Sequence, residues 1–139
     1  MSQLSIVLGR ILLGLYFLLP GLAKAAAPTQ TIAYIESHGI LFAPALMWFS
    51  AIVNIVGGLL LISGRHVRLV AYGFVVYVLL VNFMLHDFWT MGEEMVERET
   101  QNFVKNLGIL AGLLVLAGTA NTRSISLTGW WQRDKSVAD

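Results

Sequence analysis

Four long apolar stretches separated by short polar segments make up most of the chain. They run over about residues 4–27, 41–62, 67–88 and 103–120. A helix that crosses the hydrocarbon core of a bilayer needs about 20 mostly apolar residues. The pattern therefore predicts an all-α, four-helix transmembrane bundle in a single membrane domain, residues 1–139, with a polar tail over residues 121–139.

The composition supports a membrane location and excludes several other classes of protein. Apolar residues make up 57% of the chain and charged residues 12%, whereas soluble domains average about 45–50% and about 25%. There is no cysteine, which excludes disulfides and thiol redox chemistry in this chain. The net charge of +1 creates no field for a polyanion, so we expect a lipid bilayer and no nucleic acid as partner.

The first stretch also has features of a secretory signal peptide. Its apolar core runs over residues 11–22, and Ala23-Lys24-Ala25 has the form of a cleavage site. Signal peptides carry positive charge ahead of the core, but here Arg10 alone does so, directly beside the apolar residues. We therefore expect this stretch to remain as an uncleaved membrane helix.

Lysine and arginine in the connections predict the orientation of the bundle. Six of these residues fall on one side of the four stretches and three on the other, where most of the acidic residues also lie. Cytoplasmic loops carry the excess of positive charge, so both termini are predicted to be cytoplasmic. The six are Arg10, Arg65, Arg68, Arg123, Arg133 and Lys135, and the three are Lys24, Arg98 and Lys105.

Both connections on the predicted outer side favour short helices. Residues 28–40 have apolar positions spaced for an interfacial helix that ends at Gly39. Residues 89–102 are acidic, and Thr90-Met91-Gly92-Glu93 fits a helix capping box that begins at Thr90. On the opposite side, Trp130 and Trp131 are predicted to anchor the tail at the cytoplasmic headgroups.

One face of the first stretch combines small residues with two cations. Arg10, Gly14, Phe17, Gly21 and Lys24 follow one another at steps of four, three, four and three residues, so they share a helix face. This face lines a site in one interpretation. In the other it packs against a neighbouring helix while its cations extend to opposite headgroups.

Polar residues in the other stretches cost free energy in hydrocarbon and need a reason to be there. Asn54, ahead of Gly57-Gly58, serves either helix packing or a ligand. Gly108 and Gly112 form a small-xxx-small pair that suits close packing within one chain or between copies. Several further polar residues fall near the predicted outer ends of their stretches and are predicted to converge on one ligand-binding pocket: Lys24, Asn82, His86, Asp87, Lys105 and Asn106.

Other site chemistries find little support in the sequence. No two of the three histidines have the helical spacing that a metal site uses, so no metal is expected. Axial haem ligation would need a second well-placed ligand beside His86. The chain also has no glycine-rich phosphate loop after a strand and no nucleophile elbow.

Several motifs, taken in order, resemble those of the DoxX family of small four-span bacterial membrane proteins. They begin with residues 9–14, Gly21-Leu22-Ala23-Lys24 and His38-Gly39-Ile40, and continue with residues 56–64. The most specific are His86-Asp87-Phe88-Trp89 and residues 101–112. The resemblance covers nearly the whole chain except the tail, and it implies a multi-pass protein of the bacterial inner membrane.

One position departs from the family pattern. Members typically carry Glu in the second span just before the Gly-Gly pair, where this chain has Asn54. If that carboxylate pairs with the arginine of the first span, the pair here would be Arg10 and Asn54. An amide can accept a hydrogen bond from guanidinium but cannot carry the proton or the charge, so Asn54 cannot serve a mechanism that needs the carboxylate.

The resemblance leaves three hypotheses for function. The first is a quinone-linked redox protein or subunit, because some relatives are associated with thiosulfate:quinone oxidoreduction. His86 and Lys105 would then hydrogen-bond the quinone oxygens, with Asn82 or Asn106 orienting them. The second is a non-catalytic membrane partner of enzymes that handle oxidative stress. The third is a carrier that binds a small solute or an anionic lipid between Lys24 and Lys105.

Overall fold

The computed structural model describes residues 3–121 and 129–135, and the described part is helical with no strand. Four helices are long and apolar enough to cross a membrane, which confirms the predicted all-α, four-span bundle. In chain order the elements are α1 (Gln3–Ala26), α2 (Pro28–Ser37), α3 (Ala43–Ser63), α4 (Val67–Leu85), η1 (Phe88–Thr90) and α5 (Glu93–Thr119).

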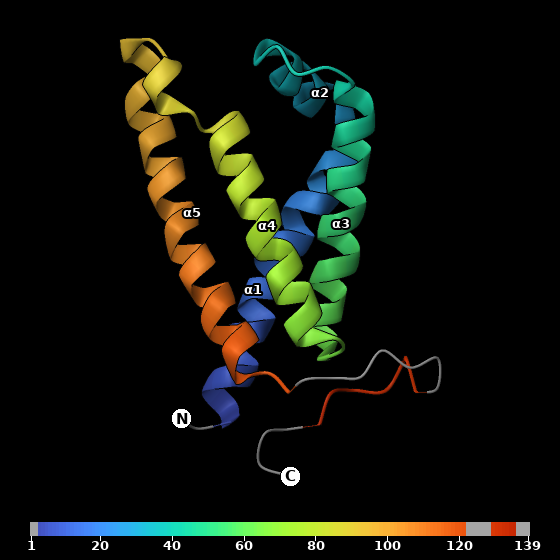
Figure 1. Cartoon of the computed structure of the whole chain (residues 1–139). Coiled ribbons are helices and arrows are strands. Elements are labelled where there is room, and N and C mark those ends of the chain that lie inside the picture. Colours follow the sequence, from blue (N-terminus) through green and yellow to red (C-terminus); the bar gives the residue numbers. More distant parts are fainter. Residues whose placement is uncertain (1–2, 122–128, 136–139) are drawn as a thin grey trace.

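The long helices pack as two antiparallel pairs, α1 with α3 and α4 with α5. The start of α1 and the end of α5 lie at one end of the bundle, which we call the tail end (Figure 1). Helices α2 and η1 lie at the opposite end, which we call the α2 end. Helix α2 is the short helix that the sequence predicts for residues 28–40, whereas residues 93–102 of the second connection form the start of α5 and no separate helix. The orientation of the bundle in the membrane stays a prediction.

Glycines allow α1 and α3 to approach closely. Gly14, Phe17 and Gly21 are the buried residues of α1, as the shared face predicts. A Cβ added at Gly58 of α3 would lie 2.7 Å from the carbonyl oxygen of Gly14, and one added at Gly21 would lie 2.9 Å from the Cβ of Asn54. These contacts fix the register of the two helices, because no larger side chain fits between the backbones.

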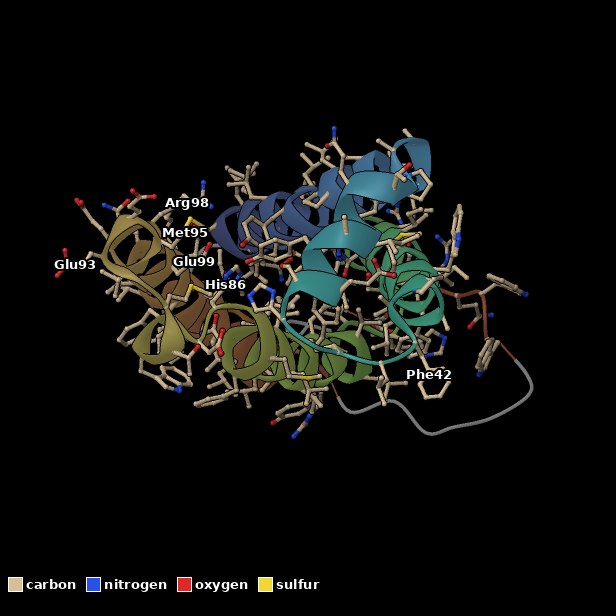
Figure 2. The ribbon with its side chains drawn as sticks, turned by 90° about the horizontal axis from the view of Figure 1, so that it is seen from above. Phe42, His86, Glu93, Met95, Arg98 and Glu99 are labelled. Carbon is tan, nitrogen blue, oxygen red and sulfur yellow. The ribbon has the colours of Figure 1, made fainter. Side chains whose placement is uncertain are left out.

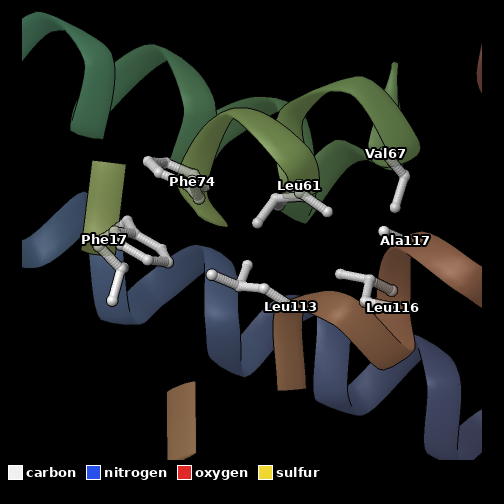
Figure 3. Close-up of a cluster of buried hydrophobic side chains, with 9 residues drawn as sticks. Phe17, Leu61, Val67, Phe74, Leu113, Leu116 and Ala117 are labelled. Carbon is white, nitrogen blue, oxygen red and sulfur yellow. The ribbon is translucent and has the colours of Figure 1, made fainter. Parts of the chain in front are cut away.

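A buried apolar cluster joins the two helix pairs toward the tail end (Figure 3). The ring of Phe17 stacks on that of Phe74, with centroids 3.7 Å apart and planes within 7°. Leu61 and Leu113 are fully buried in the same cluster. The cluster thus holds α1, α3, α4 and α5 together, and a second buried apolar cluster at the α2 end joins α2 to α3 through Ile35, Ala43, Met47 and Ala51.

Two helices end where glycine permits a left-handed backbone. Gly64 follows α3 with φ 71°, and the N–H of Arg65 donates to the carbonyl of Leu60, which closes the turn in the usual C-capping manner. Gly39 follows the end of α2 with φ 68°, as predicted.

The start of α5 differs from the sequence prediction. The helix begins at Glu93 with Gly92 as N-cap, so the capping box at Thr90 is wrong. The Thr90 hydroxyl instead donates to the carbonyl and carboxylate oxygens of Asp87. This contact closes the η1 turn, and the acidic connection continues into the membrane helix as one long α5.

The described part of the tail packs against the turn between α3 and α4. The backbone N–H groups of His66 and Val67 donate to the two carboxylate oxygens of Asp134, at 3.2 and 2.8 Å. Asp134 therefore caps the N-terminus of α4, where N–H groups lack partners within the helix. A ring nitrogen of His66 also lies 2.9 Å from the carbonyl oxygen of Trp130.

Candidate functional site

A cavity of about 360 Å³ lies at the α2 end between α2, α3 and α4, and we call it the head cavity. Its walls are largely apolar, and some of them are exposed on the outside of the bundle, as at Phe49 and Leu80, which are 66% and 55% exposed. The cavity is therefore accessible from the side that faces lipid. Its polar lining residues are Lys24, Thr31, Tyr34, Ser50, Tyr77 and His86.

Lys24 places a positive charge on the cavity wall. Its ammonium donates to the Tyr77 hydroxyl at 2.9 Å and to the Ser50 hydroxyl at 3.3 Å. The side-chain amide of Asn54 donates to the same Tyr77 oxygen at 3.3 Å. Side chains from α1, α3 and α4 thus meet around one tyrosine oxygen, and the cation is held within the bundle.

Arg10 and Asn54 do not form the pair considered from the sequence. Asn54 lies against Gly21, whereas the guanidinium of Arg10 lies against Gly64 near the tail end. Arg10 and Gly21 are about three turns of α1 apart, roughly 16 Å along the helix axis. The antiparallel register of α1 and α3 therefore brings Asn54 close to Tyr77, a partner of Lys24, and leaves Arg10 at the other end.

Beside the head cavity, His86 pairs with a buried carboxylate. The Nδ1 atom of His86 lies 2.6 Å from Glu99, whose side chain is 2% exposed. Asn102 donates to the same carboxylate at 3.3 Å, and Arg98 lies 3.7 Å from its other oxygen. Figure 2 shows His86 and Glu99 adjacent between α4 and α5, with Glu93 directed away from the bundle. The pair joins the end of α4 to α5.

Contacts from α2 hold this helix over the end of α4. The Tyr34 hydroxyl donates to the carbonyl of Leu85 at 3.0 Å, and His38 lies 3.8 Å from the carboxylate of Asp87. Burial, followed by the nearby negative charge of Glu99, raises the pKa of Tyr34 to about 12. Tyr34 therefore remains a neutral hydrogen-bond donor well above neutral pH.

Asn82 and Asn106 come together as the sequence predicts, but outside the head cavity. Asn106 donates to Asn82 at 2.7 Å, and Asn82 donates to the carbonyl of Phe103 at 3.2 Å. The Tyr16 hydroxyl donates to Asn106 at 3.1 Å. The two amides satisfy each other within the bundle, an arrangement typical of helix packing in membranes.

The structure brings part of the predicted set together. Lys24 and His86 line the head cavity, and Asp87 follows directly after His86. Lys105 is exposed on α5 and makes no hydrogen bond or ion pair within residues 3–121 and 129–135. No cluster of three potential metal ligands occurs within those same residues.

Sequence patterns do not indicate the roles of Tyr77 and Ser50 or the pairing of Glu99. Tyr77 stands in an uninterrupted apolar run, where its ring resembles any other apolar side chain. Its depth in the helix is nonetheless unusual. Tyrosines of membrane helices concentrate near the interfaces, whereas Tyr77 lies two turns inside the end of α4. Glu99 is one of several acidic residues in its connection, and nothing in the spacing marks it as the buried one.

The fold and its four apolar helices define a multi-pass membrane protein, and the head cavity with its polar lining residues lies at one end of the bundle. The DoxX family model matches residues 5–87, and the chain belongs to this family. Over 114 residues the chain is 26% identical to the inner membrane protein YphA of Escherichia coli strain K12, covering 82% of this chain and 81% of that protein. No solved structure matches.

These similarities place the chain in the bacterial inner membrane in contact with the lipid bilayer. All residues that line the head cavity fall between Lys24 and His86, inside the matched range. Helix α5, which supplies Glu99 and Asn106, lies outside it.

Proposed function

We propose that this DoxX protein binds a membrane quinone in the head cavity and acts as a quinone-linked redox protein, or as the quinone-binding subunit of one. The α2 end would face the outer side of the membrane, with both termini in the cytoplasm. The supporting observation is that polar groups of Lys24, Ser50 and Tyr77 line a cavity whose apolar wall is exposed toward lipid.

The hydrogen-bonding capacity of these groups suits a carbonyl oxygen. An ammonium has three N–H donors, and Lys24 uses two of them on Tyr77 and Ser50. The Tyr77 oxygen accepts from Lys24 and Asn54, which leaves its own hydrogen to donate. The wall thus offers donors from both Lys24 and Tyr77, and a quinone presents carbonyl acceptors on an otherwise apolar ring.

His86 is placed for proton exchange in this proposal. With Nδ1 donating to Glu99, the neutral imidazole has Nε2 as an acceptor, and histidine exchanges protons near neutral pH. In this proposal Lys24 and Tyr77 bind the quinone oxygens, because both line the cavity. Lys105, Asn82 and Asn106, which the sequence favours for these roles, do not line it. The chain has no cysteine, so thiol-derived electrons would come from a partner protein.

The test is the lipid that remains bound after purification in mild detergent. Mass spectrometry of the extract should find stoichiometric quinone in the wild type and much less in Lys24→Met, Tyr77→Phe and His86→Ala. Lys105→Met is the matched control, since it removes an exposed lysine without a hydrogen bond or ion pair in residues 3–121 and 129–135, and it should retain the quinone. Wild-type protein without quinone would overturn the proposal.

The same experiment separates the two other functions. An anionic lipid in place of the quinone, lost in Lys24→Met, would indicate a lipid-binding carrier. A redox enzyme that co-purifies while no quinone is bound would indicate a non-catalytic partner. The exposed acidic residues at the start of α5, Glu93 and Glu94, offer such an enzyme a docking surface.

A further inference from the structure

A second cavity of about 320 Å³ lies between α3 and α4, nearer the tail end, and we call it the tail groove. It is lined by side chains of α3 between Ile52 and Leu60 and by side chains of α4 between Val70 and Phe74. All its lining residues are apolar or glycine, so it offers no hydrogen-bonding group to a polar ligand.

The tail groove continues the line of the head cavity along both helices. On α3 the head cavity reaches Ser50 and the tail groove begins at Ile52; on α4 the two meet between Tyr77 and Phe74. Together they extend on α4 from Leu85 to Val70, about 22 Å along the axis at 1.5 Å per residue. The hydrocarbon core of a bilayer is about 30 Å thick, so the combined path crosses most of it.

Small residues open the groove. A Cβ added at Gly73 would meet nothing within 4 Å, which leaves open space on the α4 side. At Gly57 the Phe74 ring fills the space, because it would lie 2.5 Å from an added Cβ. Gly57 and Phe74 both line the groove. Ile52 and Val56 are 58% and 50% exposed on the α3 edge, so the groove lies open to lipid along its length.

We infer that the tail groove holds the hydrocarbon tail of the quinone whose ring occupies the head cavity, so that the protein selects quinones by tail length. This inference rests on the proposed function. It commits to the quinone tail because the lining of the groove follows that of the head cavity along α3 and α4 and has no polar side chain of its own for a separate headgroup.

The expected gain in affinity is moderate. Lipid tails are as apolar as the groove, so the tail gains packing contacts and no hydrophobic transfer energy. Many weak dispersion contacts along the groove nevertheless add up, and we expect a long-chain quinone to bind about tenfold more tightly than a short-chain quinone with the same ring.

The experiment compares these two quinones on protein reconstituted in lipid nanodiscs. Gly73→Trp should fill the groove, remove the preference for the long chain and leave the short-chain affinity unchanged. Gly108→Trp is the matched control, because Gly108 is also an exposed helical glycine with nothing within 4 Å of an added Cβ. This control should retain the preference.

The outcomes separate the inference from the proposed function. A Gly73→Trp variant that keeps the long-chain preference would overturn the inference, while its short-chain binding would leave the proposed function standing. A wild type that binds neither quinone would overturn both. As a measurement that needs no variant, a quinone with a photoreactive group at the end of its tail should label residues 52–60 or 70–74, and labelling confined to α5 would contradict the tail groove.

Discussion

The ammonium of Lys24 on α1 lies 2.9 Å from the hydroxyl oxygen of Tyr77 on α4, and Asn54 on α3 donates to that same oxygen. A cation within a membrane span is costly unless it is paired or faces a polar cavity. The hydroxyl groups of Tyr77 and Ser50 accept hydrogen bonds from this cation, on the polar part of the head-cavity wall. The tyrosine therefore both stabilises the bundle and shapes the candidate site.

Tyr77→Phe should lower the free energy of unfolding in detergent micelles by about 1–2 kcal/mol, because it leaves Lys24 and Asn54 without a shared acceptor. Tyr72→Phe is the control, since Tyr72 is a half-exposed tyrosine of the same helix without a hydrogen bond in the described residues. Equal effects of the two substitutions would show that the Tyr77 hydroxyl contributes nothing particular.

The His86–Glu99 pair should respond asymmetrically to substitution. His86→Ala should lower the free energy of unfolding by about 3 kcal/mol, because it removes the hydrogen-bond partner of a buried carboxylate. Glu99→Gln should cost less, because the amide keeps a hydrogen bond to a histidine that can stay neutral. Glu93→Gln, an exposed position on the same helix, should change nothing. Urea unfolding in detergent provides the comparison, and a larger loss in Glu99→Gln would contradict this account of the pair.

Tyr34 should make the stability depend on alkaline pH. Its pKa is about 12 in the folded protein against 10.0 ordinarily. Between these values the unfolded chain has lost the proton that the folded chain keeps, so stability falls as pH rises from about 10 to about 12. Below that window the contribution is fully present. The unfolding midpoint against pH should flatten in Tyr34→Phe, and an unchanged slope would locate the alkaline sensitivity elsewhere.

Gly58→Ala should destabilise the bundle by about 1–3 kcal/mol through overpacking. The added methyl group would lie 2.7 Å from the Gly14 carbonyl oxygen and 2.9 Å from the backbone nitrogen of Leu18, and neither backbone atom can move easily. Gly108→Ala has open space and should be neutral or slightly stabilising, since alanine is the better helix former. Thermal unfolding of the two variants gives the order directly.

With both termini in the cytoplasm, the tail end is predicted to face the cytoplasm and the α2 end the outer side of the membrane. A cysteine introduced at Glu94 should react with a membrane-impermeant maleimide added to intact spheroplasts, whereas one at Trp131 should react only after lysis. Both positions are exposed, so access to the reagent decides the result. The reverse labelling pattern would place the α2 end in the cytoplasm.

Hydropathy and helical periodicity were sufficient to predict the four spans and the packing face of α1. Gly14, Phe17 and Gly21 are buried together because residue spacing alone determines a helix face. The same information cannot give the register between helices. The sequence therefore allows a pair of Asn54 with Arg10, although contacts near Gly58 and Gly21 place Asn54 close to Tyr77.

The candidate site was predictable only in part for the same reason. Lys24 and His86 were identified because a charge or an imidazole near the end of an apolar stretch is conspicuous. Their partners Tyr77 and Glu99 were not, since each resembles its neighbours in sequence and becomes distinct only through tertiary contacts. Lys105 met the same criterion as Lys24, yet the rotation of α5 leaves it on the exposed surface.

The cap that Asp134 places on α4 has a consequence for biosynthesis. Asp134 follows Val67 by 67 residues, so α4 is made and enters the membrane well before its cap exists. Until then its first N–H groups depend on water or lipid headgroups, and the start of the helix is free to fray. The α3–α4 turn therefore acquires its final form late, after α5 has been synthesised and the tail has returned to it.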